Sequence, residues 1–305
     1  MRWLSLLLLF GMSICARNRA FGRSNGDGSD EPAQPTYHST ASEVRVAFFA
    51  TDSDDRPVED IEKGDFAVVD NEIVIREFRS FTRSASIKLD VIVLFDSSES
   101  VLPQFKQEMA DVRLLISQWP WSAEDNVSVL SFSGTEARPV CAGDCRTSLT
   151  ADRIAATPAG GSTPLFDALD TATGLLTRRG QPDVWPVIVL FSDGDDTISV
   201  SSYHEALAKV LASGAQVYAV DLGDPRQPTI GTNTLQKIAD DSGGRFVRLR
   251  DGAARIFEDV IEDLHSARIV TYALPESSSD FHSIRILPTH NLNLQFRCRR
   301  GYYSR

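Results

Sequence analysis

The sequence is poor in cysteine, in basic clusters and in long apolar runs. Only 4 of its 305 residues are cysteines, and 31 Lys and Arg side chains stand against 42 Asp and Glu, which gives a net charge of -11. An acidic chain without a Lys/Arg-rich segment lacks the surface that binds nucleic-acid phosphates. Since 42% of its residues are hydrophobic, the chain still has enough apolar side chains for one sizeable core and a smaller one.

Motifs of common enzyme classes are also missing. The chain has no H-E-x-x-H sequence, the signature of many zinc proteases, and no P-loop, the signature of many nucleotide-binding proteins. Its 5 histidines are scattered along the sequence. A general base at a distinct position, which a hydrolase would use, is therefore not evident.

The one long apolar run lies at the amino terminus. "MRWLSLLLLFGMSICA" has Arg2 as its positive residue, an apolar stretch over 3–10 and small residues before position 17, a pattern typical of an export signal. It is too short for a membrane-spanning helix, which takes about 20 apolar residues. We predict a signal peptide over 1–20, a flexible polar linker over 21–40, and an exported protein that is periplasmic, secreted or on the cell surface.

Three cysteines lie beyond that signal. In an oxidising compartment, Cys141 and Cys145 of "CAGDC" can close a small loop disulfide. The alternative is a pair of reduced thiols in a surface loop. A zinc site is not expected, because no second pair of Cys or His ligands lies nearby. Cys298 would be left unpaired.

From residue 86 onward, strand patterns alternate with amphipathic helices. Between the strands, apolar residues recur at helical intervals of three and four. Strands that are apolar on both faces and joined by helices indicate a mostly parallel sheet covered on both sides. We therefore predict an open, doubly wound α/β domain over residues 86–268. The predicted buried strands are 89–95, 127–133, 187–192, 216–222 and 246–249.

Both flanks of this region carry strand patterns without helices. Residues 41–85 and 269–305 together offer about six short strands, a number that suits a small antiparallel β-sandwich. Neither half could bury a sheet face alone. We expect the two halves to form one sandwich into which the α/β domain is inserted; the alternative is two separate β extensions that pack on the α/β domain.

Small oxygen-bearing side chains follow the predicted strands. Asp96, Ser98 and Ser100 form the pattern D-x-S-x-S directly after the first buried strand. Thr163 lies in the Gly-rich turn "GGSTPLFDAL", and Asp193 lies in "SDGDD" after "VIVLFS". Read singly, each motif is an ordinary helix cap or turn. Ligands of open parallel sheets bind where strands end, so three such motifs at successive loops indicate one binding site, provided that the strands are neighbours.

The chemistry of these side chains indicates a hard metal ion. Carboxylates and hydroxyls suit Mg²⁺, Mn²⁺ or Ca²⁺ rather than Zn²⁺. Only Asp96 and Asp193 are carboxylates, and the other donors are neutral. A divalent cation held in this way is under-neutralised and should attract a carboxylate from outside, so the pattern predicts a metal-bridged site for a Glu or Asp of a protein partner.

The same residues resemble the von Willebrand factor type A domain. That resemblance covers about residues 86–268 and implies a six-stranded, Rossmann-like sheet in which 127–133 and 137–141 form a hairpin with an antiparallel edge strand. It also implies a metal-ion-dependent adhesion site. The residues that match that site are Asp96, Ser98, Ser100, Thr163 and Asp193.

The flanks carry a second resemblance. The segment "DRPVEDIEKGDFAVVDNE" and the terminal "QFRCRRGYYSR" resemble exported bacterial proteins described as von Willebrand factor A-related (acidobacterial type). That family's opening usually reads D-x-x-G-x-P-V-x-x-L-x-x-x-D-F; here Asp55 replaces the Gly and Ile61 the Leu. This resemblance bears on architecture more than on activity.

We therefore expect an exported, non-enzymatic binding module that uses a divalent cation to bind an acidic group of a protein partner. Two alternatives remain open. One is a metal-dependent hydrolase or phosphatase, and the other is a structural envelope protein that works through its β-sandwich.

Overall fold

The computed structural model describes most of the chain after residue 42. The predicted signal peptide (1–20) and linker (21–40) lie outside the described residues. No helix in the described part is long and apolar enough to cross a membrane. The described ranges are 43–83, 87–118, 122–143, 145–181, 183–224, 226–248, 253–275 and 280–303.

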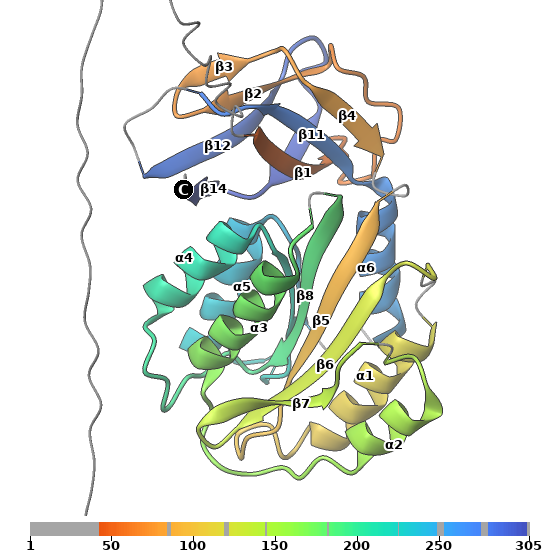
Figure 1. Ribbon diagram of the computed structural model, residues 1–305, viewed down its shortest axis with the longest axis vertical. Coiled ribbons are helices and arrows are strands. Elements are labelled where there is room, and N and C mark those ends of the chain that lie inside the picture. Colours follow the sequence, from red (N-terminus) through yellow and green to blue (C-terminus); the bar gives the residue numbers. More distant parts are fainter. Residues whose placement is uncertain are drawn as a thin grey trace, which may run out of the picture. The chain divides into compact units, whose positions relative to one another are not determined.

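A six-stranded sheet organises the α/β region (Figure 1). The strand order is β10-β9-β8-β5-β6-β7. All neighbours are parallel except β6 and β7, which pair antiparallel at one edge. This confirms the mostly parallel sheet and its antiparallel edge hairpin. The strands are β5 (Lys88–Asp96), β6 (Asn126–Ser133), β7 (Glu136–Cys141), β8 (Val184–Ser192), β9 (Gln216–Asp221) and β10 (Phe246–Arg248).

Helices cover both faces of this sheet. One face packs against α1 (Phe105–Gln118), α2 (Ser148–Ala155) and α6 (Ala253–Ser266). The other packs against α3 (Leu165–Arg179), α4 (Tyr203–Ser213) and α5 (Ile230–Ser242) (Figure 1). Apolar residues at helical intervals between the predicted strands mark each of these helices except α2.

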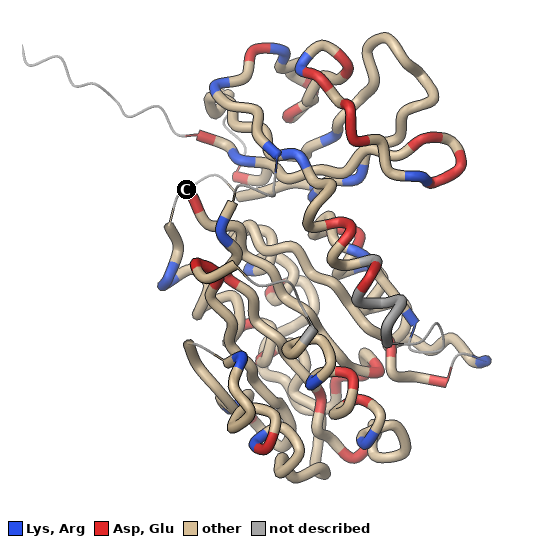
Figure 2. Tube along the Cα trace, turned by 90° about the vertical axis from the view of Figure 1, so that its right-hand side faces the viewer, with Lys and Arg blue, Asp and Glu red and all other residues tan. Residues whose placement is uncertain are grey.

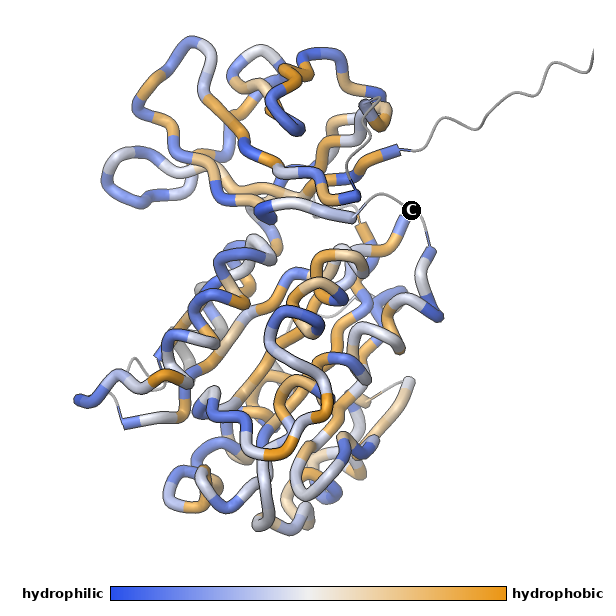
Figure 3. Tube along the Cα trace, turned by 90° about the vertical axis from the view of Figure 1, so that its left-hand side faces the viewer, coloured by the Kyte–Doolittle hydropathy of each residue, from blue (hydrophilic) through white to orange (hydrophobic). Residues whose placement is uncertain are grey.

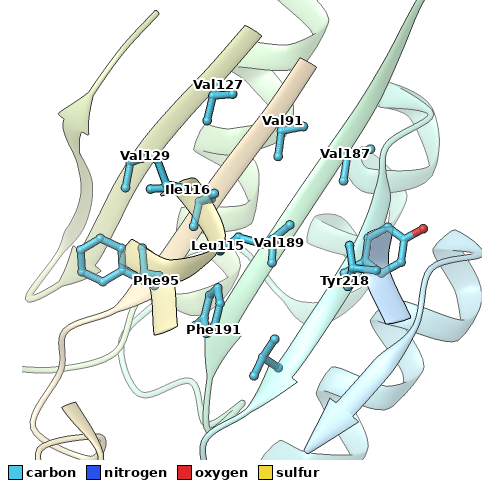
Figure 4. Close-up of a cluster of buried hydrophobic side chains, with 14 of the residues drawn as sticks. Val91, Phe95, Leu115, Ile116, Val127, Val129, Val187, Val189, Phe191 and Tyr218 are labelled. Atoms are coloured by element: carbon cyan, nitrogen blue, oxygen red, sulfur yellow. The ribbon is translucent and has the colours of Figure 1, made fainter. Parts of the chain in front are cut away.

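The apolar strands create two cores because their side chains alternate between the faces. On β5, Val91 and Phe95 face the cluster that includes α1, whereas Ile92 and Leu94 face the cluster that includes α3. Figure 4 shows the first cluster, and Figure 3 shows hydrophobic segments along the strands between more hydrophilic helices. Full burial of one such side chain stabilises the fold by about 1.5–3 kcal/mol.

Both flanks of the chain contribute to each of two antiparallel sheets. Their orders are β13-β1-β11-β4 and β14-β12-β2-β3. The doubly wound α/β fold with a sandwich built from both chain ends is thus confirmed, with two more short strands than the pattern indicated. The strands are β1 (Glu43–Thr51), β2 (Phe66–Asp70), β3 (Ile73–Ile75), β4 (Ser80–Arg83), β11 (Arg268–Ala273), β12 (Phe281–Pro288), β13 (Gln295–Cys298) and β14 (Gly301–Tyr303).

The sandwich core contains a fully buried carboxylate. Asp70 accepts hydrogen bonds from the hydroxyls of Tyr272 (2.9 Å) and Tyr302 (2.8 Å), and its other oxygen lies 2.8 Å from Nδ1 of His282. These partners come from β11, β14 and β12, so a side chain of β2 links strands of both sheets. A buried polar group satisfied in this way fixes how the strands pack.

One disulfide joins Cys141 to Cys145. Of the two alternatives for this pair, the structure therefore contains the bonded one. Cys298 on β13 is a free thiol.

Arg297 connects the sandwich to the α/β region. From β13, its Nη2 donates to Asp263 on α6 at 2.6 Å, and its Nη1 donates to the Gly243 carbonyl at the end of α5 at 2.9 Å. Its guanidinium also lies 4.0 Å from the centre of the Phe49 ring on β1. Since the Asp263 side chain is only 4% exposed, loss of Arg297 would leave a buried carboxylate with fewer donors.

We expect Arg297→Met to lower the free energy of unfolding by about 2–3 kcal/mol, because hydrogen bonds to charged groups are lost. The loss stays moderate since Arg245 also donates to Asp263. Arg300→Met is the matched control: that side chain is 74% exposed where it pairs with Asp241, so its loss should cost less than about 1 kcal/mol. Urea unfolding checks both, and equal destabilisation by the two variants would contradict this role for Arg297.

Candidate metal centre

The two strands that carry the predicted carboxylates are neighbours. β5 and β8 pair in parallel, with Val91 opposite Val187 and Phe95 opposite Phe191. Both strands therefore end at the same edge of the sheet. Asp96 closes β5, and Asp193 directly follows the end of β8.

Asp96 is fully buried at this edge. Its Oδ1 accepts a hydrogen bond from the Ser98 backbone N–H at 2.8 Å, and its Oδ2 accepts one from the Ser192 hydroxyl at 2.9 Å. Burial raises the pKa of Asp96 to about 6; the hydrogen bonds from Ser98 and Ser192 oppose that rise, and the negative charge of Asp193 adds to it. Hydrogen bonds thus hold both oxygens of the carboxylate in place. None of the groups that shift its pKa is positively charged.

Hydrogen bonds hold the three predicted loops together. The Glu99 backbone N–H donates to the Gly161 carbonyl at 2.9 Å, which ties the loop after β5 to the Gly-rich turn. Thr163 and Thr197 exchange two bonds: the Thr163 N–H donates to the Thr197 hydroxyl at 2.8 Å, and the Thr197 N–H donates to the Thr163 carbonyl at 2.9 Å. The structure thus brings together all three loops that the sequence pattern singled out.

The five predicted residues differ in their access to solvent. Ser98 and Thr163 are buried with Asp96, whereas Asp193 is half-buried and Ser100 is exposed. The hydroxyls of Ser98 and Ser100 lie 3.0 Å apart. A group bound here would rest on buried oxygens and remain reachable from outside past Ser100 and Asp193.

Gly194 makes the close approach of the next helix possible. Its φ is +80°, and a Cβ at this position would lie 2.1 Å from the Gly231 carbonyl oxygen. Its N–H donates to the Ser192 hydroxyl at 3.0 Å, the same hydroxyl that binds Asp96. The glycine of "SDG" is therefore required by the packing of α5 and keeps Ser192 in place.

The residues fit a hard divalent cation. A buried carboxylate without a counter-charge and a buried hydroxyl beside it are oxygen ligands of the kind that Mg²⁺, Mn²⁺ and Ca²⁺ take. Within the described ranges, no three His, Cys, Asp or Glu side chains gather closely enough to hold a metal by themselves. A cation here would thus depend on the hydroxyls of Ser98, Ser100 and Thr163 as well as on the two carboxylates.

One acidic residue near this site is not among the residues that the sequence motifs predict. Glu108 on α1 is fully buried, and neither of its carboxyl oxygens has a hydrogen-bond partner. The signal was present in the sequence: Glu108 lies three residues after Phe105 and four before Val112, both of which pack into the core beneath the sheet. A Glu on the apolar stripe of a helix is unusual unless it is paired.

A match to a family model agrees with this geometry. Residues 90–263 match the von Willebrand factor type A domain. The chain belongs to this family. Von Willebrand factor type A domains generally mediate metal-dependent binding and commonly hold a divalent metal at a metal-ion-dependent adhesion site.

Among curated proteins, the chain is similar to the magnesium-chelatase 60 kDa subunit of Cereibacter sphaeroides, with 25% identity over 170 residues. The match covers 52% of this chain and 30% of the length of that subunit.

Solved structures with a related fold include a von Willebrand factor type A protein from Catenulispora acidiphila, at 14% identity and a TM-score of 0.48, covering 86% of this chain and 75% of that one. Another is proximal thread matrix protein 1 from the mussel byssus, at 17% identity and a TM-score of 0.48, covering 64% and 51%.

Without a cation, Asp96 should make stability depend on pH. The pKa of an Asp in the unfolded chain is about 3.9, whereas the pKa of Asp96 in the folded protein is about 6. Between these values the folded state binds more protons, so the free energy of unfolding falls as the pH rises, by about 3 kcal/mol in total. Thermal unfolding in chelator should show this loss between about pH 4 and pH 7.

Asp96→Asn should reduce that pH dependence, and saturating Mg²⁺ should offset the loss at neutral pH in the wild type. Glu99→Gln, an exposed neighbour, should behave as the wild type does. Identical pH profiles for the wild type and Asp96→Asn would show that the Asp96 carboxyl is not the group responsible.

Proposed function

We propose that the chain is a non-enzymatic binding module that holds a divalent cation at Asp96, Ser98, Ser100, Thr163 and Asp193. The cation bridges the protein to an acidic side chain of a protein partner. The observation that carries this proposal is the convergence of the three loops around a buried, uncompensated carboxylate, with Ser100 and Asp193 on the solvent side.

Charge explains why the partner's group should be acidic. The donors supply two carboxylates and three neutral hydroxyls, and only one of the carboxylates is fully buried. A hard cation takes six or more oxygen ligands, so the described donors leave positions for others. An incoming Glu or Asp carboxylate supplies an oxygen and a negative charge together, which no neutral side chain does.

We propose binding rather than hydrolysis because the polar groups of these loops are already engaged with one another. Ser192 is committed to Asp96, and Thr197 is committed to Thr163. These contacts set the positions of ligand oxygens and supply no separate group that would activate water.

We further propose that the chain is exported. The apolar amino-terminal run has the pattern of a signal peptide, and the Cys141–Cys145 disulfide is typical of proteins from oxidising compartments. A fusion of residues 1–40 to a reporter that folds only outside the cytoplasm should be active, and deletion of residues 3–10 should abolish that activity.

Isothermal titration with Mg²⁺ and Mn²⁺ tests the cation site. The chain without its predicted signal, residues 21–305, should bind one ion, and Asp96→Ala and Asp193→Ala should lose it because each removes a ligand charge. Asp152→Ala, an exposed acidic residue on α2, is the matched control and should bind as the wild type does. A folded wild type that binds neither ion at millimolar concentration would refute the proposal.

Partner binding is tested in the same proteins. Immobilised wild type should capture an envelope protein with Mg²⁺ present and release it on addition of chelator, whereas Asp96→Ala should capture none. Capture that persists in chelator and in Asp96→Ala would instead assign binding to another surface, such as the β-sandwich.

A further inference from the structure

Helix α1 places a carboxyl group in the core beside the cation site. Glu108 has no exposed surface, and both of its oxygens lack a hydrogen-bond partner. Its neighbours along the helix, Met109 and Val112, pack in the apolar cluster below the sheet. An apolar side chain would fill this position without loss, whereas a buried, unpaired carboxyl group is costly.

The surroundings of Glu108 make that cost higher. Burial is the first cause that raises the pKa of Glu108 well above its ordinary range, followed by the negative charges of Asp96 and Asp193 and then of Asp111. The Asp96 backbone N–H faces the carboxyl and opposes the rise in part, although no hydrogen bond of ordinary geometry forms. No Lys or Arg is among the described groups that shift this pKa.

A proton alone does not resolve this arrangement. A protonated Glu108 would be neutral, but it would bury a donor and an acceptor without partners, each at a cost of about 1–3 kcal/mol. A divalent cation beside Asp96 would instead lower the electrostatic energy of all three carboxylates, since attraction between buried charges is poorly screened.

We propose that Glu108 is an outer carboxylate of the cation site. It does not bind the ion directly, because no three acidic side chains in the described part of the chain are close enough to share one ion. Its buried negative charge holds the cation more tightly from the α1 side and helps to position Asp96. The inference rests on the proposed metal-binding function and adds a residue to the five that bear ligand oxygens.

The experiment is Mn²⁺ titration of residues 21–305 as wild type, Glu108→Gln and Glu108→Met. Groups outside the ligand set change metal affinity by about 10- to 100-fold, and we expect a loss of at least about tenfold in both variants. Glu108→Met removes the buried polar group altogether and provides a folded variant if the Gln amide is not accommodated. In chelator, Glu108→Met should also unfold at a higher temperature than the wild type, because it replaces a buried polar group without partners by an apolar one.

Two controls separate this role from a general effect of charge. Asp111→Asn changes the next buried carboxyl on α1, which has a partner in Gln107 at 2.7 Å, and Asp152→Asn changes an exposed carboxyl on α2. Both should leave the affinity within about twofold. An equal loss in Asp111→Asn would overturn the specific role of Glu108.

Two further outcomes distinguish the inference from the proposed function. If the wild type binds Mn²⁺, Asp96→Ala abolishes binding and both Glu108 variants keep full affinity, the inference is wrong and the function stands. If the folded wild type binds no Mn²⁺, the proposed function fails and the inference fails with it.

Discussion

The burial of a carboxylate at the end of the central strand is the constraint on which this sheet edge depends. β5 lies between β6 and β8 and is covered by helices on both faces. Its last residue, Asp96, is therefore shielded from water. Its negative charge must therefore be stabilised by polar groups from other segments of the chain. The Ser192 hydroxyl comes from the neighbouring strand, and Gly194 allows α5 to approach behind it. Figure 2 shows Asp and Glu positions interspersed with Lys and Arg positions along the whole described chain, whose sequence has a net charge of -11.

Much of the fold and of the site could be predicted because the decisive signals are local. Apolar runs followed by Asp96 and Asp193 identify strands and the points where they end, and parallel sheets bring such ends together. Helix α2 was missed because only Thr150 and Ile154 of it are buried, which is too few for a helical period. Glu108 was missed because a search for apolar periodicity counts a buried Glu as a polar interruption.

The strand partners in the sandwich could not be read from the sequence, for a different reason. Alternation of side chains tells which face of a strand is buried but not which strand lies beside it. β1 pairs with β11 and β13, more than two hundred residues away along the chain. The short strands β4 and β14 exist because β11 and β12 offer free edges to them. Only the folded chain settles such pairings, and Asp70 fixes several at once.

The way in which the α/β region leaves the sandwich has a mechanical consequence. β4 leads into that region and β11 returns from it, and the two pair antiparallel with Arg83 opposite Arg268. A force on the α/β region that acts along these strands is therefore divided between the two of them. Hydrogen bonds between antiparallel strands lie across that direction, so the bonds between β11 and β1 are loaded in shear, all at once. Such a connection between the two parts of the chain resists tension better than one whose hydrogen bonds open one after another.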